Sequence, residues 1–123
     1  MKRILVIDDA ATVRMYHRQV LETAGYQVDE AVNGYEGLEK AVTTEYALLI
    51  VDINMPVMDG YTMLSKLRSD YGQIATPAIM VSTEEKASDN EKAFAVGANF
   101  YVIKPAKPEE LLVAVRMLIG MEN

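Results

Sequence analysis

The stretch of residues 48–60 constrains the fold more than any other part of the sequence. Four consecutive apolar residues, from Leu48 to Val51, lead directly into Asp52, which is the pattern of a strand buried on both faces that ends in a carboxylate. Asp59 then supplies a helix N-cap beside a glycine turn. The sequence therefore predicts a buried parallel strand that carries Asp52, a candidate reaction centre, to the edge of a sheet.

The rest of the chain alternates short apolar runs with segments of helical period. These patterns predict strands at residues 3–7, 27–32, 48–52, 78–81 and 99–103. They predict helices at 11–24, from 34, at about 61–68, from 88 to before Gly97, and from Pro108. The inward positions include Tyr16 or His17 on the first helix and Leu38, Ala41 and Val42 on the second, and a capping box of Ser88 with Glu91 begins the fourth helix.

This alternation of strands and helices is typical of an α/β protein with right-handed crossovers. We expect a doubly wound, flavodoxin-like (βα)5 sandwich around a parallel five-stranded sheet of order 2-1-3-4-5. The second predicted strand is the most polar, and this order puts it at an edge. The same order makes the first and third strands neighbours, so that ligands would bind beyond their carboxyl ends.

Composition excludes several classes of function. The chain of 123 residues fits one domain, residues 1–123, and it contains no cysteine for disulfides or zinc-thiolate sites. A net charge of −6 with scattered basic residues makes nucleic acid an unsuitable partner. No apolar stretch is long enough to cross a bilayer, and the first apolar run is too short for a signal peptide. We therefore expect a cytoplasmic monomer that does not bind a membrane.

Polar residues follow the ends of four predicted strands. Asp8 and Asp9 end the first, Asp52 the third, Ser82 the fourth and Lys104 the fifth. Carboxyl ends of parallel strands meet at one edge of a sheet, where three carboxylates about 4 Å apart would repel one another by a few kcal/mol per pair. A hard divalent cation relieves this repulsion, and Mg²⁺ suits carboxylate oxygens that also leave room for a phosphate.

The same residues are suited to phosphoryl transfer. The chain has neither form of glycine-rich phosphate loop, so nucleotide binding is not expected. An ionised Asp52 is already a nucleophile that can form an acyl phosphate, and Mg²⁺, Lys104 and Ser82 would neutralise the phosphoryl oxygens. The single histidine, His17, is expected to be exposed on the first helix and not beside the site. Hydrolysis should therefore be slow, which describes a switch that catalyses only its own phosphorylation and dephosphorylation, not an enzyme.

These residues resemble the receiver domain of two-component response regulators, over the whole chain. The matched set is Asp8-Asp9, Asp52 within D-x-N-M-P-x-M-D-G, Ser82, Tyr101 and Lys104-Pro105, and it is most similar to the stand-alone chemotaxis members of the family. The resemblance implies that Asp52 accepts a phosphoryl group from a histidine kinase. It also implies that Asp9, Asp52 and the Asn54 backbone carbonyl bind Mg²⁺, that Asp8 reaches the metal largely through water, and that the Lys104-Pro105 bond is cis.

Further roles follow from the resemblance alone. Ser82 and Tyr101 would be a coupled switch pair, and Asn54 and Glu84 would tune dephosphorylation. An output protein, such as a flagellar motor switch protein, would bind the face made by the fourth helix, fifth strand and last helix, and a phosphatase is a further expected partner. That face carries Phe94, Ala114 and Met117, and Ala106 stands where the family often has an aromatic residue, so the identity of the output partner stays open.

Three alternatives compete with this interpretation. A phosphorelay shuttle or a phosphate sink would use the same chemistry. A Mg²⁺-dependent phosphatase of the haloacid dehalogenase kind would place its nucleophile in D-x-D after the first strand, where this chain has Asp8-Asp9-Ala10. An adaptor that binds partners without phosphorylation usually lacks one of the acids or the lysine, and this chain has them all. With no output domain expected after Asn123, the signal would be delivered by binding.

Overall fold

The computed structural model describes residues 2–83 and 87–121. Five strands alternate with five helices in the described part of the chain. The strands are β1 (Arg3–Ile7), β2 (Gln27–Ala31), β3 (Leu48–Asp52), β4 (Ala78–Ser82) and β5 (Phe100–Ile103). The helices are α1 (Ala11–Thr23), α2 (Gly34–Thr43), α3 (Gly60–Ser69), α4 (Ala87–Ala95) and α5 (Pro108–Ile119).

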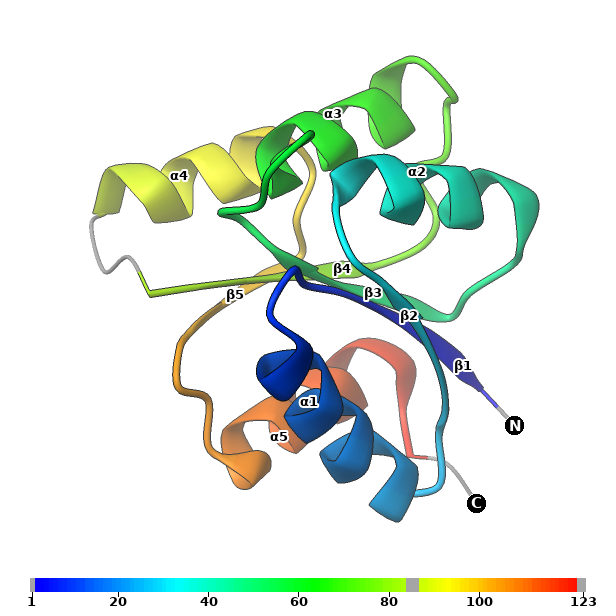
Figure 1. The fold of residues 1–123 in the computed structure, drawn as a ribbon, viewed down its shortest axis with the longest axis vertical. Coiled ribbons are helices and arrows are strands. Elements are labelled where there is room, and N and C mark those ends of the chain that lie inside the picture. The colour runs from blue at the N-terminus through cyan, green and yellow to red at the C-terminus, as the bar shows by residue number, and fades with distance from the viewer. Residues whose placement is uncertain (1, 84–86, 122–123) are drawn as a thin grey trace.

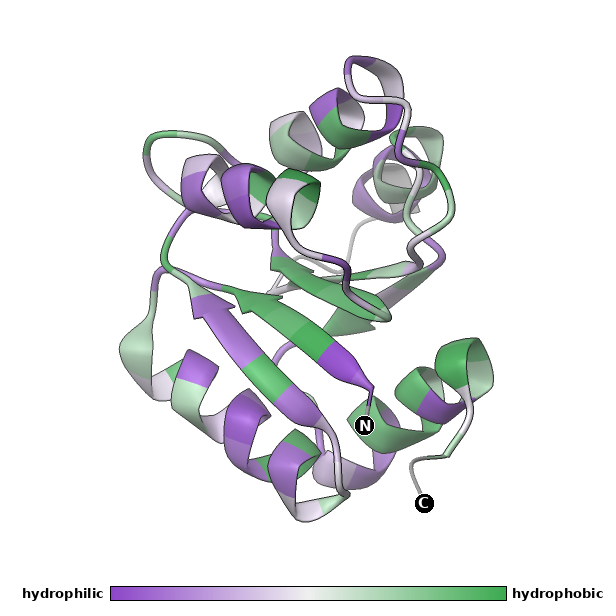
Figure 2. Ribbon diagram, turned by 90° about the vertical axis from the view of Figure 1, so that its right-hand side faces the viewer, coloured by the Kyte–Doolittle hydropathy of each residue, from purple (hydrophilic) through white to green (hydrophobic). Residues whose placement is uncertain are grey.

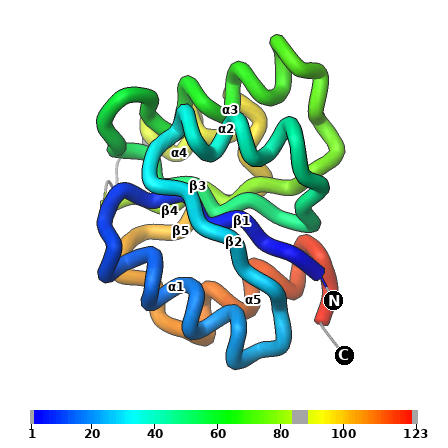
Figure 3. The backbone as a smooth tube through the Cα atoms, turned by 45° about the vertical axis from the view of Figure 1, so that its right-hand side comes forward, coloured from blue at the N-terminus to red at the C-terminus, as the bar shows by residue number. Residues whose placement is uncertain are grey.

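The strands form one parallel sheet in the order β2-β1-β3-β4-β5. Helices α1 and α5 cover one face, and α2, α3 and α4 cover the other (Figure 1). The same two layers are visible after rotation in Figure 3. The predicted fold class and strand order are therefore confirmed.

Two apolar clusters fill the space between the sheet and its helices. Leu5 and Ile7 of β1 point into the cluster under α2 and α3, whereas Ile4 and Val6 point into the cluster under α1 and α5. All four side chains are fully buried, as the continuous apolar pattern of a central parallel strand requires. Figure 2 shows the contrast with β2, whose polar colouring marks it as an edge strand.

The sheet register brings the strand ends to one edge. Ile7 pairs with both Ala31 and Val51, so Asp8 and Asp52 follow neighbouring strands at the same level. Asp52 pairs in turn with Val81. Ser82 and Lys104 lie at the ends of the next two strands. The polar residues that the sequence predicts at strand ends are thus collected at the carboxyl edge of the sheet.

Some local expectations were wrong. Val42 is 40% exposed, although it was expected on the inner face of α2. Leu38 and Ala41 are buried as expected, together with Gly34 and Gly37. An added Cβ at Gly37 would stand 2.7 Å from the Ile7 side chain, so the missing side chain lets α2 lie close to the sheet on that side. The buried face therefore extends to Gly34 and Gly37, and Val42 lies at its solvent-exposed edge.

The beginning of α4 also differs from the expectation. The helix starts at Ala87, so Ser88 lies inside it and is not the residue before it. The side chain of Ser88 lies outside the described residues, and the expected capping box with it. The Asp59 cap is confirmed, because its Oδ1 accepts a hydrogen bond of 2.8 Å from the Thr62 backbone N–H. No helix in the described ranges is long and apolar enough to cross a membrane.

Candidate functional site

Three carboxylates meet beyond the ends of β1 and β3. Each of Asp8, Asp9 and Asp52 offers one oxygen that lies within 4.8 Å of the oxygens of the others. Asp8 is 2% exposed and Asp52 is 5% exposed, whereas Asp9 is exposed to solvent. The site is therefore a small acidic recess with two buried walls and one open side.

Backbone contacts hold Asp8 in this recess. Its backbone N–H donates to the Ala31 carbonyl over 3.1 Å, which extends the pairing of β1 with β2 by one residue. Its carboxylate Oδ1 accepts a hydrogen bond of 2.9 Å from the Ala10 backbone N–H. Asp8 consequently orients the first turn of α1 as well as the acidic recess.

Lys104 supplies the cation of the recess. Its Nζ donates to Asp8 Oδ2 over 2.8 Å and to Asp52 Oδ1 over 3.0 Å. Its backbone N–H donates to the Ser82 carbonyl over 2.8 Å, so β4 fixes the point from which the side chain starts. The Lys104-Pro105 peptide bond is cis, as the resemblance implied. The residue therefore bridges β1 and β3 from a third position in the sheet.

The charges of the recess perturb one another. Burial, together with the charges of Asp8 and Asp9, raises the pKa of Asp52 to about 6, against a hydrogen bond from Lys104 that lowers it. Burial disfavours the charged form of Lys104, but its hydrogen bonds to Asp8 and Asp52 outweigh that effect and raise its pKa. Asp52 stays mostly ionised at neutral pH, and keeping this charge buried lowers the free energy of unfolding.

The donor set fits a hard divalent cation. The three acids present only oxygen ligands, and the open side at Asp9 leaves space for water or a phosphate oxygen. Asn54 is exposed in the loop that leaves β3, two residues after Asp52. Carboxylate oxygens at this mutual distance are the ligands that Mg²⁺ prefers.

The loop after Asp52 is held tightly against β3 and α2. The Gly60 backbone N–H donates to the Ile53 carbonyl over 2.9 Å, and the Gly34 N–H donates to the Met58 carbonyl over 3.0 Å. Between them, Val57 has a φ of 70° at the centre of a three-residue turn closed by a hydrogen bond from Met58 to Pro56. Such a conformation is strained for a β-branched residue, so the loop is shaped by its surroundings.

Substituting Gly60 with Ala should destabilise the protein by about 1–3 kcal/mol. An added Cβ would stand 2.4 Å from the Asp52 carbonyl oxygen, which is backbone and cannot move aside. Urea denaturation measures the change. Gly37→Ala should cost less, because its Cβ would meet the Ile7 side chain rather than backbone, and alanine favours the helix. Equal stability of Gly60→Ala and wild type would contradict this account of the loop.

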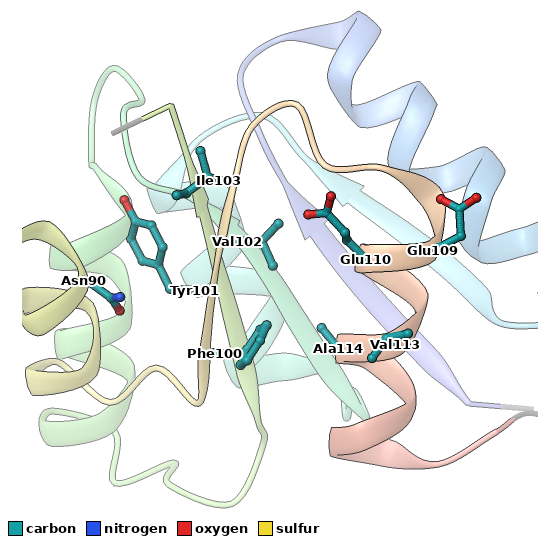
Figure 4. Close-up of a pocket in the computed structure, with 9 residues that line it drawn as sticks. All are labelled: Asn90, Phe100, Tyr101, Val102, Ile103, Glu109, Glu110, Val113 and Ala114. Atoms are coloured by element: carbon teal, nitrogen blue, oxygen red, sulfur yellow. The ribbon is translucent and has the colours of Figure 1, made fainter. Parts of the chain in front are cut away.

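Ser82 and Tyr101 lie on the same side of the sheet. Ser82 ends β4 and is 1% exposed, and Met80, two residues earlier, packs in the same apolar cluster as Tyr101. Tyr101 is half-buried and lies between β5 and α4 (Figure 4). It lines a cavity of about 570 Å³ together with Ile103 and Val113. Glu84, the remaining residue expected to tune dephosphorylation, lies outside the described residues.

His17 corrects an expectation. The residue is 2% exposed, not on the outer surface of α1, and it lines a cavity of about 200 Å³ with Lys104, Pro105 and Ala106. Its Nδ1 has no hydrogen-bond partner among the described residues, and burial lowers its pKa against the opposing charge of Asp8. The helical period left Tyr16 and His17 as alternatives. Tyr16 lies at the rim because its hydroxyl donates to the Ala106 carbonyl over 2.9 Å.

One contact of the recess had no counterpart in the sequence analysis. The Arg14 guanidinium donates to the Asp8 backbone carbonyl over 2.8 Å and to the Glu30 carboxylate over 3.0 Å. The only signals in the sequence are a basic residue one turn into the first helix and an acidic residue in the second strand. Neither signal indicates a contact without the sheet order that places β2 beside β1.

Comparison with known proteins agrees with this geometry. The model of the response regulator receiver domain matches residues 4–116. The transcriptional regulatory protein ResD of Bacillus subtilis (strain 168) is 34% identical over 117 residues, which are 95% of this chain and 48% of ResD. The chain therefore spans about half the length of that relative.

Two solved structures are similar over nearly their whole length. The chemotaxis protein CheY4 of Vibrio cholerae has a TM-score of 0.90 and 34% identity, with 96% of this chain and 98% of that chain covered. The receiver domain of a sensor histidine kinase from Pseudomonas aeruginosa PAO1 has a TM-score of 0.88 and 27% identity, with coverage of 97% and 98%. The latter is described with a magnesium ion coordinated in its active site cleft.

Proposed function

The chain belongs to the family of response regulator receiver domains, and we propose that it is a single-domain response regulator over residues 1–123 that is phosphorylated on Asp52. Membership of this family implies a histidine kinase as phosphodonor and an output partner. The observation that carries the proposal is the bridge of Lys104 to Asp8 and Asp52 beside an exposed third acid. This arrangement presents one nucleophilic carboxylate among groups that bind a phosphoryl group.

The proposed step is a phosphoryl transfer between two proteins. A carboxylate oxygen of Asp52 forms a bond to phosphorus, while the bond from phosphorus to the imidazole nitrogen of the kinase breaks and leaves its electron pair on that nitrogen. Asp52 needs no general base, because its pKa of about 6 leaves it mostly ionised at neutral pH. Lys104 Nζ, 3.0 Å from Asp52 Oδ1, is placed to neutralise charge on the transferred group.

Asp8, Asp9, Asp52 and the Asn54 backbone carbonyl would hold Mg²⁺ in this reaction. When bound, the ion supplies positive charge to the phosphoryl oxygens that Lys104 does not contact. The fit rests on the oxygen-only donor set, whose members lie within 4.8 Å of one another. Asp9 forms the open side, where both the ion and the phosphoryl group can enter.

Phosphorylation would be transmitted through Ser82 and Tyr101 to an output surface. Ser82 ends the strand next to β3, and Tyr101 lies on the next strand, in the same apolar cluster as Met80. In our proposal the Ser82 hydroxyl binds the phosphoryl group and Tyr101 moves into the space that opens. Tyr101 lines the cavity between α4, β5 and α5, so its movement would change the surface offered to a partner (Figure 4).

A chemotaxis role is the leading candidate among outputs. We propose a cytoplasmic regulator that binds a flagellar motor switch protein, and the likeness to the chemotaxis protein CheY4 supports this output. The likeness to ResD, of which the chain spans about half, supports instead the receiver part of a regulator of transcription. A phosphorelay shuttle or a phosphate sink remains the runner-up, and it is distinguished by whether the phosphoryl group passes to a second histidine protein.

Intact mass spectrometry after mixing with acetyl phosphate and Mg²⁺ tests the proposal. We expect a single phosphoryl adduct on the wild type and none on Asp52→Asn. Asp59→Asn is the matched control, because it makes the same change in the same loop and asparagine also caps a helix. An adduct that decays within about a minute once the donor is removed would favour chemotaxis, and one that lasts hours would favour a relay. An adduct on Asp52→Asn equal to that of the wild type would exclude the proposal.

A further inference from the structure

Asp9 has no side-chain anchor within the described part of the chain. Its carboxylate is exposed, and it makes no hydrogen bond or ion pair with another described residue. Asp8 and Asp52, by contrast, are buried and both accept hydrogen bonds from Lys104. With no side-chain partner, the Asp9 carboxylate is positioned only through its backbone, and the two peptide units on either side of it fix where the side chain starts.

Each of these peptide units is fixed by one hydrogen bond. The unit after Asp9 is held where the Ala10 N–H donates to Asp8 Oδ1 over 2.9 Å. The unit before it is held where Arg14 donates to the Asp8 carbonyl over 2.8 Å. Loss of the second bond would free the peptide plane from which Asp9 starts.

Arg14 is itself held by the edge strand. Its Nε donates to Glu30 Oε1 over 3.0 Å, and its side chain is only 15% exposed. Arg18, one turn further along α1, donates to Glu30 Oε2 over 2.6 Å. These hydrogen bonds keep the pKa of Glu30 below its usual value, so its carboxylate stays charged and orients both guanidinium groups. Helix α1 runs beside β2 on the face where this pairing occurs (Figure 3).

We propose that Arg14 is a positioning residue that holds Asp9 in the orientation needed to bind the divalent cation, an inference that rests on the proposed function. Its charge alone would have the opposite effect, because a guanidinium near a cation site repels the ion. Glu30 offsets that charge and leaves the hydrogen bond to the Asp8 carbonyl as the main contribution. Loss of the hydrogen bond would raise the Kd for Mg²⁺, whereas loss of the charge alone would lower it. A measured Kd therefore distinguishes the two effects.

Isothermal titration of Mg²⁺ into wild type, Arg14→Met and Arg18→Met separates the effects. We expect the Kd of Arg14→Met to rise about tenfold, since a charge-assisted hydrogen bond that orients a ligand is lost. Arg18→Met should stay within about twofold of wild type, because it removes the same charge and the same Glu30 partner without touching Asp8. An unchanged or lower Kd for Arg14→Met would overturn the proposal in favour of simple charge repulsion.

A second readout excludes a purely structural effect. At saturating Mg²⁺, Arg14→Met should be phosphorylated by acetyl phosphate at a rate within about twofold of wild type, because the bound ion itself restores the position of Asp9. Arg14→Lys, which keeps the charge and can donate to the Asp8 carbonyl but lacks the guanidinium fork, should recover part of the Mg²⁺ affinity. A general loss of fold would lower the rate at every Mg²⁺ concentration and would overturn the positioning role. Absence of Mg²⁺ binding by wild type would refute the proposed function and this inference together.

Discussion

Asp52→Asn should raise the free energy of unfolding by about 1–3 kcal/mol when Mg²⁺ is removed by a chelator. Asp52 is 5% exposed, and its pKa rises from 3.8 to about 6 because burial and the neighbouring acids disfavour its charge. Asparagine has nearly the same shape without that charge. Lys104 keeps Asp8 as its partner, so the substitution does not leave it unpaired.

The pH dependence of this gain has a definite sign. A group whose pKa is raised in the folded state binds more protons folded than unfolded, so the wild type gains stability from Asp52 as pH falls through about 6. The advantage of Asp52→Asn should therefore be full above that pH and vanish near 3.8. His17, whose pKa is lowered from 6.5, acts in the opposite direction, but it is common to both proteins and cancels in their difference.

Thermal unfolding at a series of pH values measures the effect. We expect a melting temperature higher by about 3–6 °C for each kcal/mol at neutral pH. Asp59→Asn serves as the control for the loss of a negative charge from the same loop. Equal stability of Asp52→Asn and wild type at neutral pH would mean that burial of the ionised Asp52 carboxylate does not lower the free energy of unfolding. Added Mg²⁺ should stabilise the wild type more than the variant, because the variant lacks one ligand.

Lys104→Met should destabilise the protein by about 2–4 kcal/mol at about pH 8 without Mg²⁺. The substitution leaves Asp8 and Asp52, which are 2% and 5% exposed, without the cation that contacts both. The pKa of Asp52, which is already raised to about 6, would rise further because the lowering hydrogen bond from Lys104 is lost. The variant should consequently regain stability as pH falls, because protonation removes the uncompensated charge.

Urea denaturation with and without Mg²⁺ tests this second prediction. Mg²⁺ should recover part of the loss, since a divalent cation can replace the ammonium among the acids. Lys107→Met is the matched control, because Lys107 lies in the same segment but is exposed and makes no contact with the recess. A loss of equal size in Lys107→Met, or one that does not depend on pH, would contradict the proposed role of Lys104 as counter-charge.

The part of the site that the sequence predicted is the part encoded by strand ends. Asp8, Asp52, Ser82 and Lys104 each follow a continuous apolar run, and parallel pairing places all such ends at one edge. The inference needed only the strand order, which the polarity of residues 27–32 indicated. Their mutual approach follows from topology and does not depend on side-chain detail.

The residues that the sequence did not predict depend on packing between elements. His17 is inside and Tyr16 at the rim because the Ala106 carbonyl accepts from the tyrosine hydroxyl, a contact across 90 residues of chain. Val42 is outside because the buried face of α2 lies where Gly37 packs closely on Ile7 of the sheet. Arg14 reaches Asp8 because Glu30 stands on the neighbouring strand. A helical period of apolar residues carries no information on these distant partners.

The bridge made by Lys104 also bears on the order of folding. Its partners Asp8 and Asp52 lie 96 and 52 residues earlier in the chain, so the bridge closes only after β5 has joined the sheet. Closing loops of this length costs conformational entropy, so we expect the bridge to form late, after most of the sheet has paired. We therefore expect the stability lost in Lys104→Met to appear chiefly as faster unfolding in stopped-flow measurements, with little change in the folding rate. In kinetic terms, Lys104 would slow the unfolding of the native sheet without accelerating its formation.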